Sequence, residues 1–278
     1  MHSCKHKHTK HLIKTTVFVF ALLLWSNVSY AYGSKTLVEQ FKANSSQNNG
    51  TSDVGRSDRA IAGLSEANTV RSKMINQTLF DRVLAAALAG DGDRLNSFAD
   101  AHQLNTLDAH GLSAVLHAVK LGRLDAARLL IDAGADVDAF DPELSKNVID
   151  QTAFLYAGAT GNNEALKMLL KAGAKTDIHN YYGGTALIPA AEKGFVSTVK
   201  LLLEESDTNV NHVNNLGWTA LMEAVVLSNG GPDHQQIVKL LLAHRADPKI
   251  TDREGITALQ HAQSKGFDEI VQILSAHK

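Results

Sequence analysis

Apolar positions at helical spacing and short polar stretches alternate from Asn76 to the end of the chain. Apolar residues from Leu79 to Leu88 recur every three to four positions, which predicts an amphipathic helix. Gly90-Asp91-Gly92-Asp93 interrupts the pattern, and Leu95 and Phe98 resume it in a second short helix. The same order of helix, break and helix continues to Lys278, so we expect order to begin near Asn76 and to consist of paired short helices.

A five-residue phrase recurs within this pattern at intervals of 33 to 39 residues. All five copies have Ser or Thr third and Ala fourth. Gly stands first in four of them, and Asp stands first in the second copy. The copies begin at Gly111, Asp150, Gly183, Gly217 and Gly255. A period of this size indicates that one supersecondary unit is stacked many times.

Each unit repeats the same helix signals. The hydroxyl residue of the phrase is suited to cap the first helix, because its side chain can accept a hydrogen bond from a backbone N–H three residues on. Four of the units carry Gly nine residues later, where a helix can end in the left-handed conformation. The capping residues are Ser113, Thr152, Thr185, Thr219 and Thr257, and the helix-ending glycines are Gly122, Gly161, Gly194 and Gly266. A second helix with a leucine-rich run follows, and then a short polar segment long enough for a β-turn finger. Pro189 falls inside a first helix and is expected to distort it.

The phrase, the glycine spacing and endings such as Ala133-Gly-Ala-Asp136 resemble the ankyrin repeat family, whose unit is about 33 residues of finger, helix, turn and helix. The resemblance implies an all-α, ankyrin-type helix-turn-helix solenoid with short β-turn fingers and about six units, including an atypical N-terminal cap. Ala replaces the Pro that the family often has at the first helical position, and helix propensity is preserved by that change. The expected units are 76–107, 108–141, 149–180, 181–214, 215–251 and 252–278, with insertions at 142–148 and 229–233.

The first 75 residues do not follow this pattern. Residues 1–31 combine a lysine-containing start without acids, an apolar run from Val17 to Trp25 and small residues before position 32, which is typical of a secretory signal peptide. Residues 32–75 are rich in polar residues and are predicted to form a flexible tether before the repeat domain at 76–278. We therefore expect an exported protein, periplasmic in the first place and extracellular as the alternative.

Composition narrows the range of functions. Removal of residues 1–31 takes four of the 27 Lys and Arg residues and none of the 29 acids, so the net charge becomes 23 − 29 = −6. An acidic chain is a poor candidate for binding nucleic acid or anionic membranes. The single cysteine, Cys4, lies in the signal segment, which excludes thiol chemistry afterwards. No catalytic motif, cofactor motif or metal-ligand spacing is found, and the acids between Asp136 and Glu143 lack the pattern of a calcium loop.

The resemblance also assigns a binding surface, because partners of ankyrin repeats usually lie against the concave face of finger tips and first helices. The residues at those positions are His110, Leu112, Tyr181, Tyr182, Lys193, Asn215, Leu216, Trp218, Arg253 and Glu254, with Ile256 beside them. Exposed Trp, Tyr and Arg often act as binding anchors. The alternative for Trp218 and for the tyrosine pair is that they pack between neighbouring fingers and stabilise the stack.

These observations lead to three functional hypotheses. The first is a monomeric, non-enzymatic module that binds a protein partner of unknown identity and inhibits, protects or scaffolds it. The second has the same fold but acts as a secreted effector on a host protein. The third is a hydrolase or redox enzyme concealed in the repeats, which the absence of motifs argues against.

Overall fold

The computed structural model describes residues 55–100 and 102–277, so the expected signal peptide at 1–31 lies outside the described residues. All regular secondary structure in that described part is α-helical, and three isolated antiparallel bridges link residues of the fingers. The helices are α3 (Gly55–Ala89), α4 (Gly92–Asp100), α5 (Ala114–Lys120), α6 (Leu124–Asp132), α7 (Ala153–Thr160), α8 (Asn163–Lys171), α9 (Leu187–Glu192), α10 (Val196–Glu205), α11 (Ala220–Val226), α12 (Pro232–Ala243), α13 (Ala258–Lys265) and α14 (Asp268–Ser275). The predicted helix-turn-helix solenoid is thereby confirmed.

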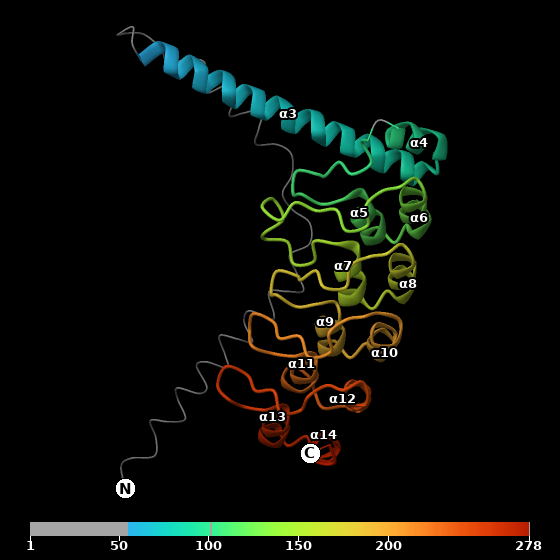
Figure 1. Cartoon of the computed structure of the whole chain (residues 1–278), viewed down its shortest axis with the longest axis vertical. Helices are drawn as coiled ribbons and strands as arrows, with labels where there is room; N and C mark the ends of the chain where they lie inside the picture. The colour runs from blue at the N-terminus through green and yellow to red at the C-terminus, as the bar shows by residue number, and fades with distance from the viewer. Residues whose placement is uncertain (1–54, 101, 278) are drawn as a thin grey trace. The chain divides into compact units, whose positions relative to one another are not determined.

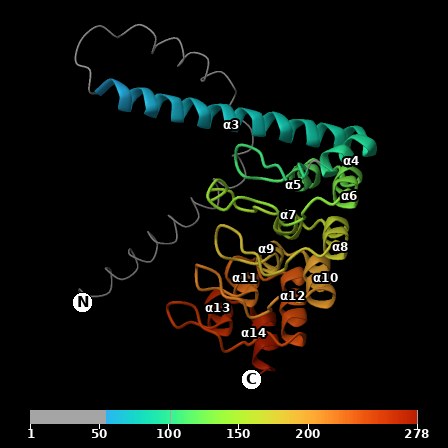
Figure 2. The same cartoon turned by 45° about the horizontal axis from the view of Figure 1, so that its top comes forward.

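Gly63–Lys278 forms one compact unit in which the helices are arranged in two rows. Helices α5, α7, α9, α11 and α13 form the inner row, and α6, α8, α10, α12 and α14 pack behind them as the outer row (Figure 1). The fingers project from the inner row on the side away from the outer helices (Figure 2). We call the surface made by the fingers and the inner helices the inner face.

Helix α3 begins earlier than the sequence pattern predicts. The tether was expected to reach residue 75, whereas α3 starts at Gly55 and continues without a break to Ala89. Residues 55–75 contain no proline and many good helix formers, so local propensity permits a helix there. Val70, Met74 and Ile75 are exposed, which explains why the pattern of buried positions gave no sign of it.

The last turns of α3 are the part that caps the stack. Phe80, Val83 and Ala87 are buried, and the ring of Phe80 meets that of His117 edge-on at 5.2 Å. Arg123 of the first full unit donates to the carbonyl of Leu88 at 3.1 Å. The atypical first unit therefore closes the end of the core with apolar contacts and one charge-assisted bond.

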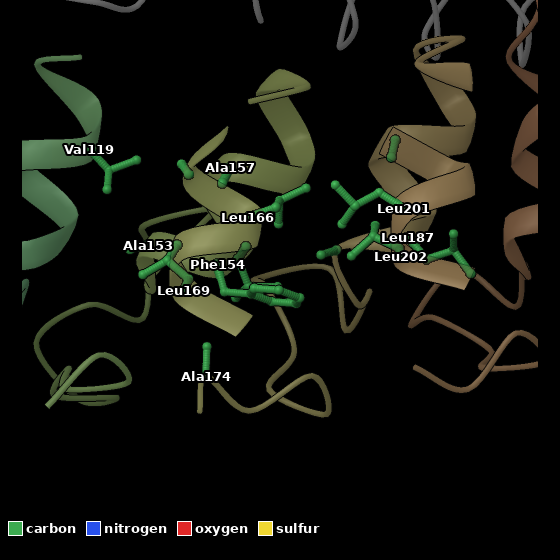
Figure 3. Packing of buried hydrophobic residues seen from close by; sticks show 14 of the residues in the cluster. Val119, Ala153, Phe154, Ala157, Leu166, Leu169, Ala174, Leu187, Leu201 and Leu202 are labelled. Carbon is green, nitrogen blue, oxygen red and sulfur yellow. The ribbon is translucent and has the colours of Figure 1, made fainter. Parts of the chain in front are cut away.

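The core is continuous through the stack and consists of side chains from both helix rows. Phe154 of α7 and Leu187 of α9 are nearly completely buried, as are Leu166 and Leu169 of α8 (Figure 3). Alanines of the inner helices, such as Ala153 and Ala157, are also completely buried. Because each unit buries its apolar side only against its neighbours, the array depends on contacts between adjacent repeats.

The predicted helix caps are confirmed in four of the five units. The side chains of Ser113, Thr152, Thr219 and Thr257 each accept a hydrogen bond from the backbone N–H three residues later, at 3.3 Å. Gln260 completes a capping box with Thr257. The four helix-ending glycines all have φ between 69° and 76°, the left-handed conformation that glycine adopts without strain.

Thr185 is the exception, and the prediction that its hydroxyl caps a helix is wrong. Its Oγ1 is buried without a hydrogen-bond partner, and the N–H of Ile188 binds the Thr185 carbonyl at 3.2 Å instead. The cause is Pro189, which has no N–H to donate to that carbonyl, so the preceding N–H takes its place. Helix α9 consequently starts later, at Leu187.

This difference predicts opposite effects of one substitution at two equivalent positions. Thr219→Val removes a cap bond and is expected to lower the free energy of unfolding by about 1 kcal/mol. Thr185→Val removes a buried hydroxyl that has no partner, so it is expected to leave stability unchanged or to raise it by about 1 kcal/mol. Urea unfolding of both variants measures the effect, and equal destabilisation would show that Thr185 is capped in solution.

Each insertion is ordered by hydrogen bonds to one side chain at or directly before its first residue. Asp141 precedes the first insertion, and its Oδ1 accepts from the N–H groups of Glu143 and Leu144 at 2.9 and 3.1 Å. In the second insertion, Asn229 Oδ1 accepts from the Gly231 N–H at 2.9 Å, immediately before α12 begins at Pro232. The first insertion is therefore a short structured loop, and the second is a short turn whose last two residues begin α12.

Candidate functional site

The fingers are shaped by an Asp or Asn at their first position. Its Oδ1 accepts hydrogen bonds from the backbone N–H groups two and four residues later, at 2.8 to 3.0 Å. The four residues with this role are Asp108, Asn180, Asn214 and Asp252. Each such turn fixes the backbone that carries the predicted binding residues.

The other atom of the same side chain ties the finger to its own inner helix. Asp108 Oδ2 lies 2.8 Å from His117 Nε2, and Asp252 Oδ2 lies 2.7 Å from His261 Nε2. Burial acts to raise the pKa of Asp108, but the bond to His117 and the backbone N–H donors outweigh it, so the pKa falls below its usual value. Hydrogen bonds at both carboxylate oxygens thus hold finger and helix together.

Neighbouring fingers are joined mainly through backbone atoms. The Tyr181 N–H donates to the carbonyl of Ile149 at 3.0 Å, and the Asn215 N–H donates to the carbonyl of Tyr182 at 2.8 Å. The last link uses a side chain, because the Arg253 guanidinium donates to the carbonyl of Asn215. The tips are consequently held in register along the inner face.

Most of the predicted binding residues lie at the surface. The exposed fraction is 49% for Tyr181 and 37% for Leu216, and the rings of Tyr181 and Tyr182 meet edge-on at 5.1 Å. Tyr182 is half-buried. The other predicted residues that are exposed are His110, Lys193, Asn215, Arg253 and Glu254. Two consecutive fingers of the stack therefore present an aromatic side chain, Tyr181, and an apolar one, Leu216, at the surface.

Trp218 is half-buried and packs against the hydrophobic core. Its backbone pairs with Asn214 across the finger turn, with its N–H donating to Asn214 Oδ1 at 3.0 Å. Part of the indole is therefore covered by the core, and the role of Trp218 as a binding anchor stays a prediction.

Leu112 is not an exposed residue, contrary to the prediction. Only 5% of its surface is accessible, and its backbone forms an antiparallel bridge with Phe140 of the next finger. The side chain therefore belongs to the core and is unavailable to a partner.

Lys193 has a structural contact besides its exposed position. Its Nζ donates to the carbonyl of Ala159 at 2.6 Å, near the carboxyl end of α7, where carbonyl groups lack helical partners. Lys193 therefore bridges two consecutive inner helices.

The sequence interpretation missed three carboxyl groups whose pKa values are raised, two on inner helices and one directly before α7. Glu223 of α11 has 3% exposure, and burial together with the nearby Glu192 raises its pKa to about 8. Burial also raises the pKa of Glu192, although the charge of Lys193 acts to lower it. Burial raises the pKa of Asp150 as well. The available signal was Glu223 itself, a charged residue inside the otherwise apolar run of α11, nine positions after the finger residue Asn214.

A separate cavity of about 460 Å³ lies between two units near the ends of the outer helices. His179 and His212 stack along it with ring centroids 4.3 Å apart, and Thr176 Oγ1 donates to Asp207 Oδ1 at 2.6 Å. Burial, with His212 as the second cause, lowers the pKa of His179. No group of three or more His, Cys, Asp or Glu side chains in the described residues could hold a metal ion.

No helix among residues 55–100 and 102–277 combines the length and the apolar character required to cross a membrane. This includes α3, in which charged and polar residues are distributed along the helix.

Comparison with known proteins agrees with this geometry. Family models for ankyrin repeats match residues 154–252 and residues 115–170. The chain is 39% identical over 194 residues to the ankyrin repeat protein YahD of Escherichia coli (strain K12), covering 69% of this chain and 94% of that protein. Among solved structures, it is similar to an ankyrin repeat domain from Acinetobacter baumannii AYE, with 43% identity, a TM-score of 0.60, and coverage of 70% of this chain and 96% of the other. It is also similar to the ankyrin repeat protein EF0377, with 38% identity, a TM-score of 0.62, and coverage of 72% and 98%.

The chain belongs to the ankyrin repeat family. Ankyrin repeat proteins are in general protein-interaction modules, and their stacked units form extended binding surfaces. The resemblance noted from the sequence is therefore confirmed at the level of family and fold.

Proposed function

We propose that this chain is a non-enzymatic binding module that acts outside the cytoplasm and holds a protein partner on its inner face. The observation that carries the proposal is the exposure of Tyr181 and Leu216 on adjacent, hydrogen-bonded fingers. A large apolar side chain held on a rigid backbone gives binding energy at a low cost in ordering. Export, with the periplasm as the first destination, is supported by the signal-like segment at 1–31.

The partner is expected to be inhibited, protected or scaffolded by this contact. The secreted effector that binds a host protein is the second candidate, because it needs the same surface and differs only in destination. Cell fractionation with detection of the chain in periplasm and medium separates these two.

The surface is tested by affinity capture from the cell fraction that contains the chain. A Tyr181→Ala, Leu216→Ala double variant is expected to weaken retention of the specific partner at least tenfold, because each anchor contributes about 2 kcal/mol when it is central. A matched control is the Met74→Ala, Ile75→Ala variant, which also removes two exposed apolar side chains but from α3.

The control is expected to retain the partner as the wild type does. Retention of the same proteins by the finger variant, or loss only in the α3 variant, would show that the inner face is not the binding surface. Circular dichroism of both variants verifies that the helices are intact.

A further inference from the structure

The cavity of about 460 Å³ lies between the second and third full units and is partly open to solvent. Its walls come from the segment that follows α8 and the segment that follows α10. This volume lies within the range of about 300–1,000 Å³ that is common for small-molecule sites. Its lining is mainly polar, so a ligand that fits it must form hydrogen bonds.

Thr185 lines this cavity with a hydroxyl group that the fold leaves unused. The residue is only 2% exposed, and its Oγ1 has no hydrogen-bond partner. The hydroxyl is left over because Pro189 delays the start of α9, whereas the equivalent hydroxyls of the other four units cap their helices. A hydroxyl in this state can donate to a ligand and accept from it, which would offset the cost of its burial.

The two stacked histidines add hydrogen-bonding nitrogens to the lining. His212 Nε2 lies 2.6 Å from the carbonyl oxygen of Gly183. Because a carbonyl only accepts, Nε2 carries the hydrogen, and Nδ1 of the neutral ring is an acceptor. Burial, followed by the neighbouring His212, lowers the pKa of His179, which favours its uncharged form. The ring of His179 therefore offers an anion no charge at neutral pH.

The remaining ionised groups of the lining are mostly acidic. Lys175 stands against two carboxylates, those of Asp177 and Asp207. The Asp207 carboxylate is held in place by Thr176, whose Oγ1 donates to Oδ1 at 2.6 Å. Carboxylates accept hydrogen bonds from hydroxyl groups and repel anions, so this lining favours a neutral ligand that carries hydroxyl groups.

We propose that the cavity binds one neutral, hydroxyl-rich small molecule, a monosaccharide or a linear polyol. Such a molecule places several donors and acceptors on a compact frame, which matches a lining of carboxylate, hydroxyl and imidazole groups. Its hydroxyl groups would donate to Asp177 and Asp207 and form the hydrogen bond that Thr185 lacks. The cavity shares no lining residue with the proposed partner surface around Tyr181 and Leu216, so this inference does not depend on the proposed function.

The test is a titration of the full chain with D-glucose, D-galactose and D-mannitol, followed by NMR of the imidazole Cε1–H signals. The signals of His179 and His212 are assigned by their loss in His179→Gln and His212→Gln. At least one of the three probes is expected to shift both signals to saturation, while the signal of His261, which pairs with Asp252 outside the cavity, stays in place.

Two further probes test the chemistry of recognition. Tetrahydropyran, which is the pyranose ring without hydroxyl groups, is expected to shift neither histidine signal. D-glucuronate, which has a carboxylate on the same ring, is expected to bind at least tenfold less tightly than the neutral probes that bind, because the lining is acidic.

Thr185→Val is expected to weaken binding at least tenfold, although it leaves the chain no less stable than the wild type. Thr185→Ser keeps the hydroxyl group and is expected to bind as the wild type does. The matched control is Thr219→Val, which removes the equivalent hydroxyl of the next unit outside the cavity and is expected to keep full binding. The proposal is overturned if none of the three neutral probes shifts the two signals, if tetrahydropyran shifts them equally, or if Thr185→Val binds undiminished.

Discussion

The Glu223→Gln variant is expected to be markedly more stable than the wild type at pH 9 and about equally stable at pH 4.5. Burial and Glu192 raise the pKa of Glu223 to about 8 from an ordinary value of 4.5. Between pH 4.5 and about pH 8, Glu223 of the folded chain keeps a proton that it has released in the unfolded chain. Stability of the wild type therefore falls as the pH rises from about 4.5 to about 8, and it levels off above that.

Glutamine has no charge to bury, and its side-chain oxygen can still accept the hydrogen bond from Asn214. The gain at pH 9 is expected to be on the order of 3–5 kcal/mol, which corresponds to a rise in Tm of about 10 °C for a domain of this size. Thermal unfolding at the two pH values measures it. Glu254→Gln is the control, because that side chain is exposed on a finger, and its Tm is expected to follow the wild type. An equal gain at both pH values would contradict a buried carboxyl group as the cause.

Gly158→Ala is expected to disrupt the interface between the second and third full units. A Cβ atom at Gly158 of α7 would lie 2.7 Å from the Cβ of Ala186 and 2.9 Å from its carbonyl oxygen. The second of these atoms belongs to the backbone, so the clash can be relieved only if the two units move apart. We expect a loss of about 3 kcal/mol in the free energy of unfolding, in spite of the higher helix propensity of alanine.

The matched control is Gly92→Ala at the start of α4, where an added Cβ meets nothing within 4 Å. That variant is expected to unfold at the same denaturant concentration as the wild type or slightly later. Because repeat arrays are held by contacts between neighbours, Gly158→Ala is also expected to broaden the transition or divide it into two. Identical transitions in the two glycine variants would show that the interface tolerates the extra methyl group.

The fold was predictable because its signals are local and repeated. Ser113, Thr152 and Gly161 each act within one helix turn, so their roles can be inferred without knowledge of distant contacts. The prediction that Thr185 caps a helix was wrong because a proline four residues later changed which backbone N–H was available. The repeat pattern does not show this local effect. The start of α3 at Gly55 was missed because exposed helix leaves no pattern of buried positions.

The candidate site was only partly predictable. Tyr181 and Leu216 stand at the tips of their fingers, and they are exposed as predicted. The burial of Leu112 depends on its bridge to Phe140, and that of Trp218 depends on packing against the core. The charge state of Glu223 depends on Glu192 of the preceding unit and on burial, which no spacing within one repeat can show.

The backbone links between fingers have a consequence for how binding specificity can change. The bond from the Tyr181 N–H to Ile149 and the bond from the Asn215 N–H to Tyr182 use atoms that almost every amino acid possesses. Side chains at the tips can therefore be exchanged over evolutionary time without loss of the links that align the fingers. Arg253 is the exception, since its own guanidinium makes the link to Asn215. A library that varies positions 181 and 216 and preserves position 253 would thus explore new partners on an unchanged scaffold.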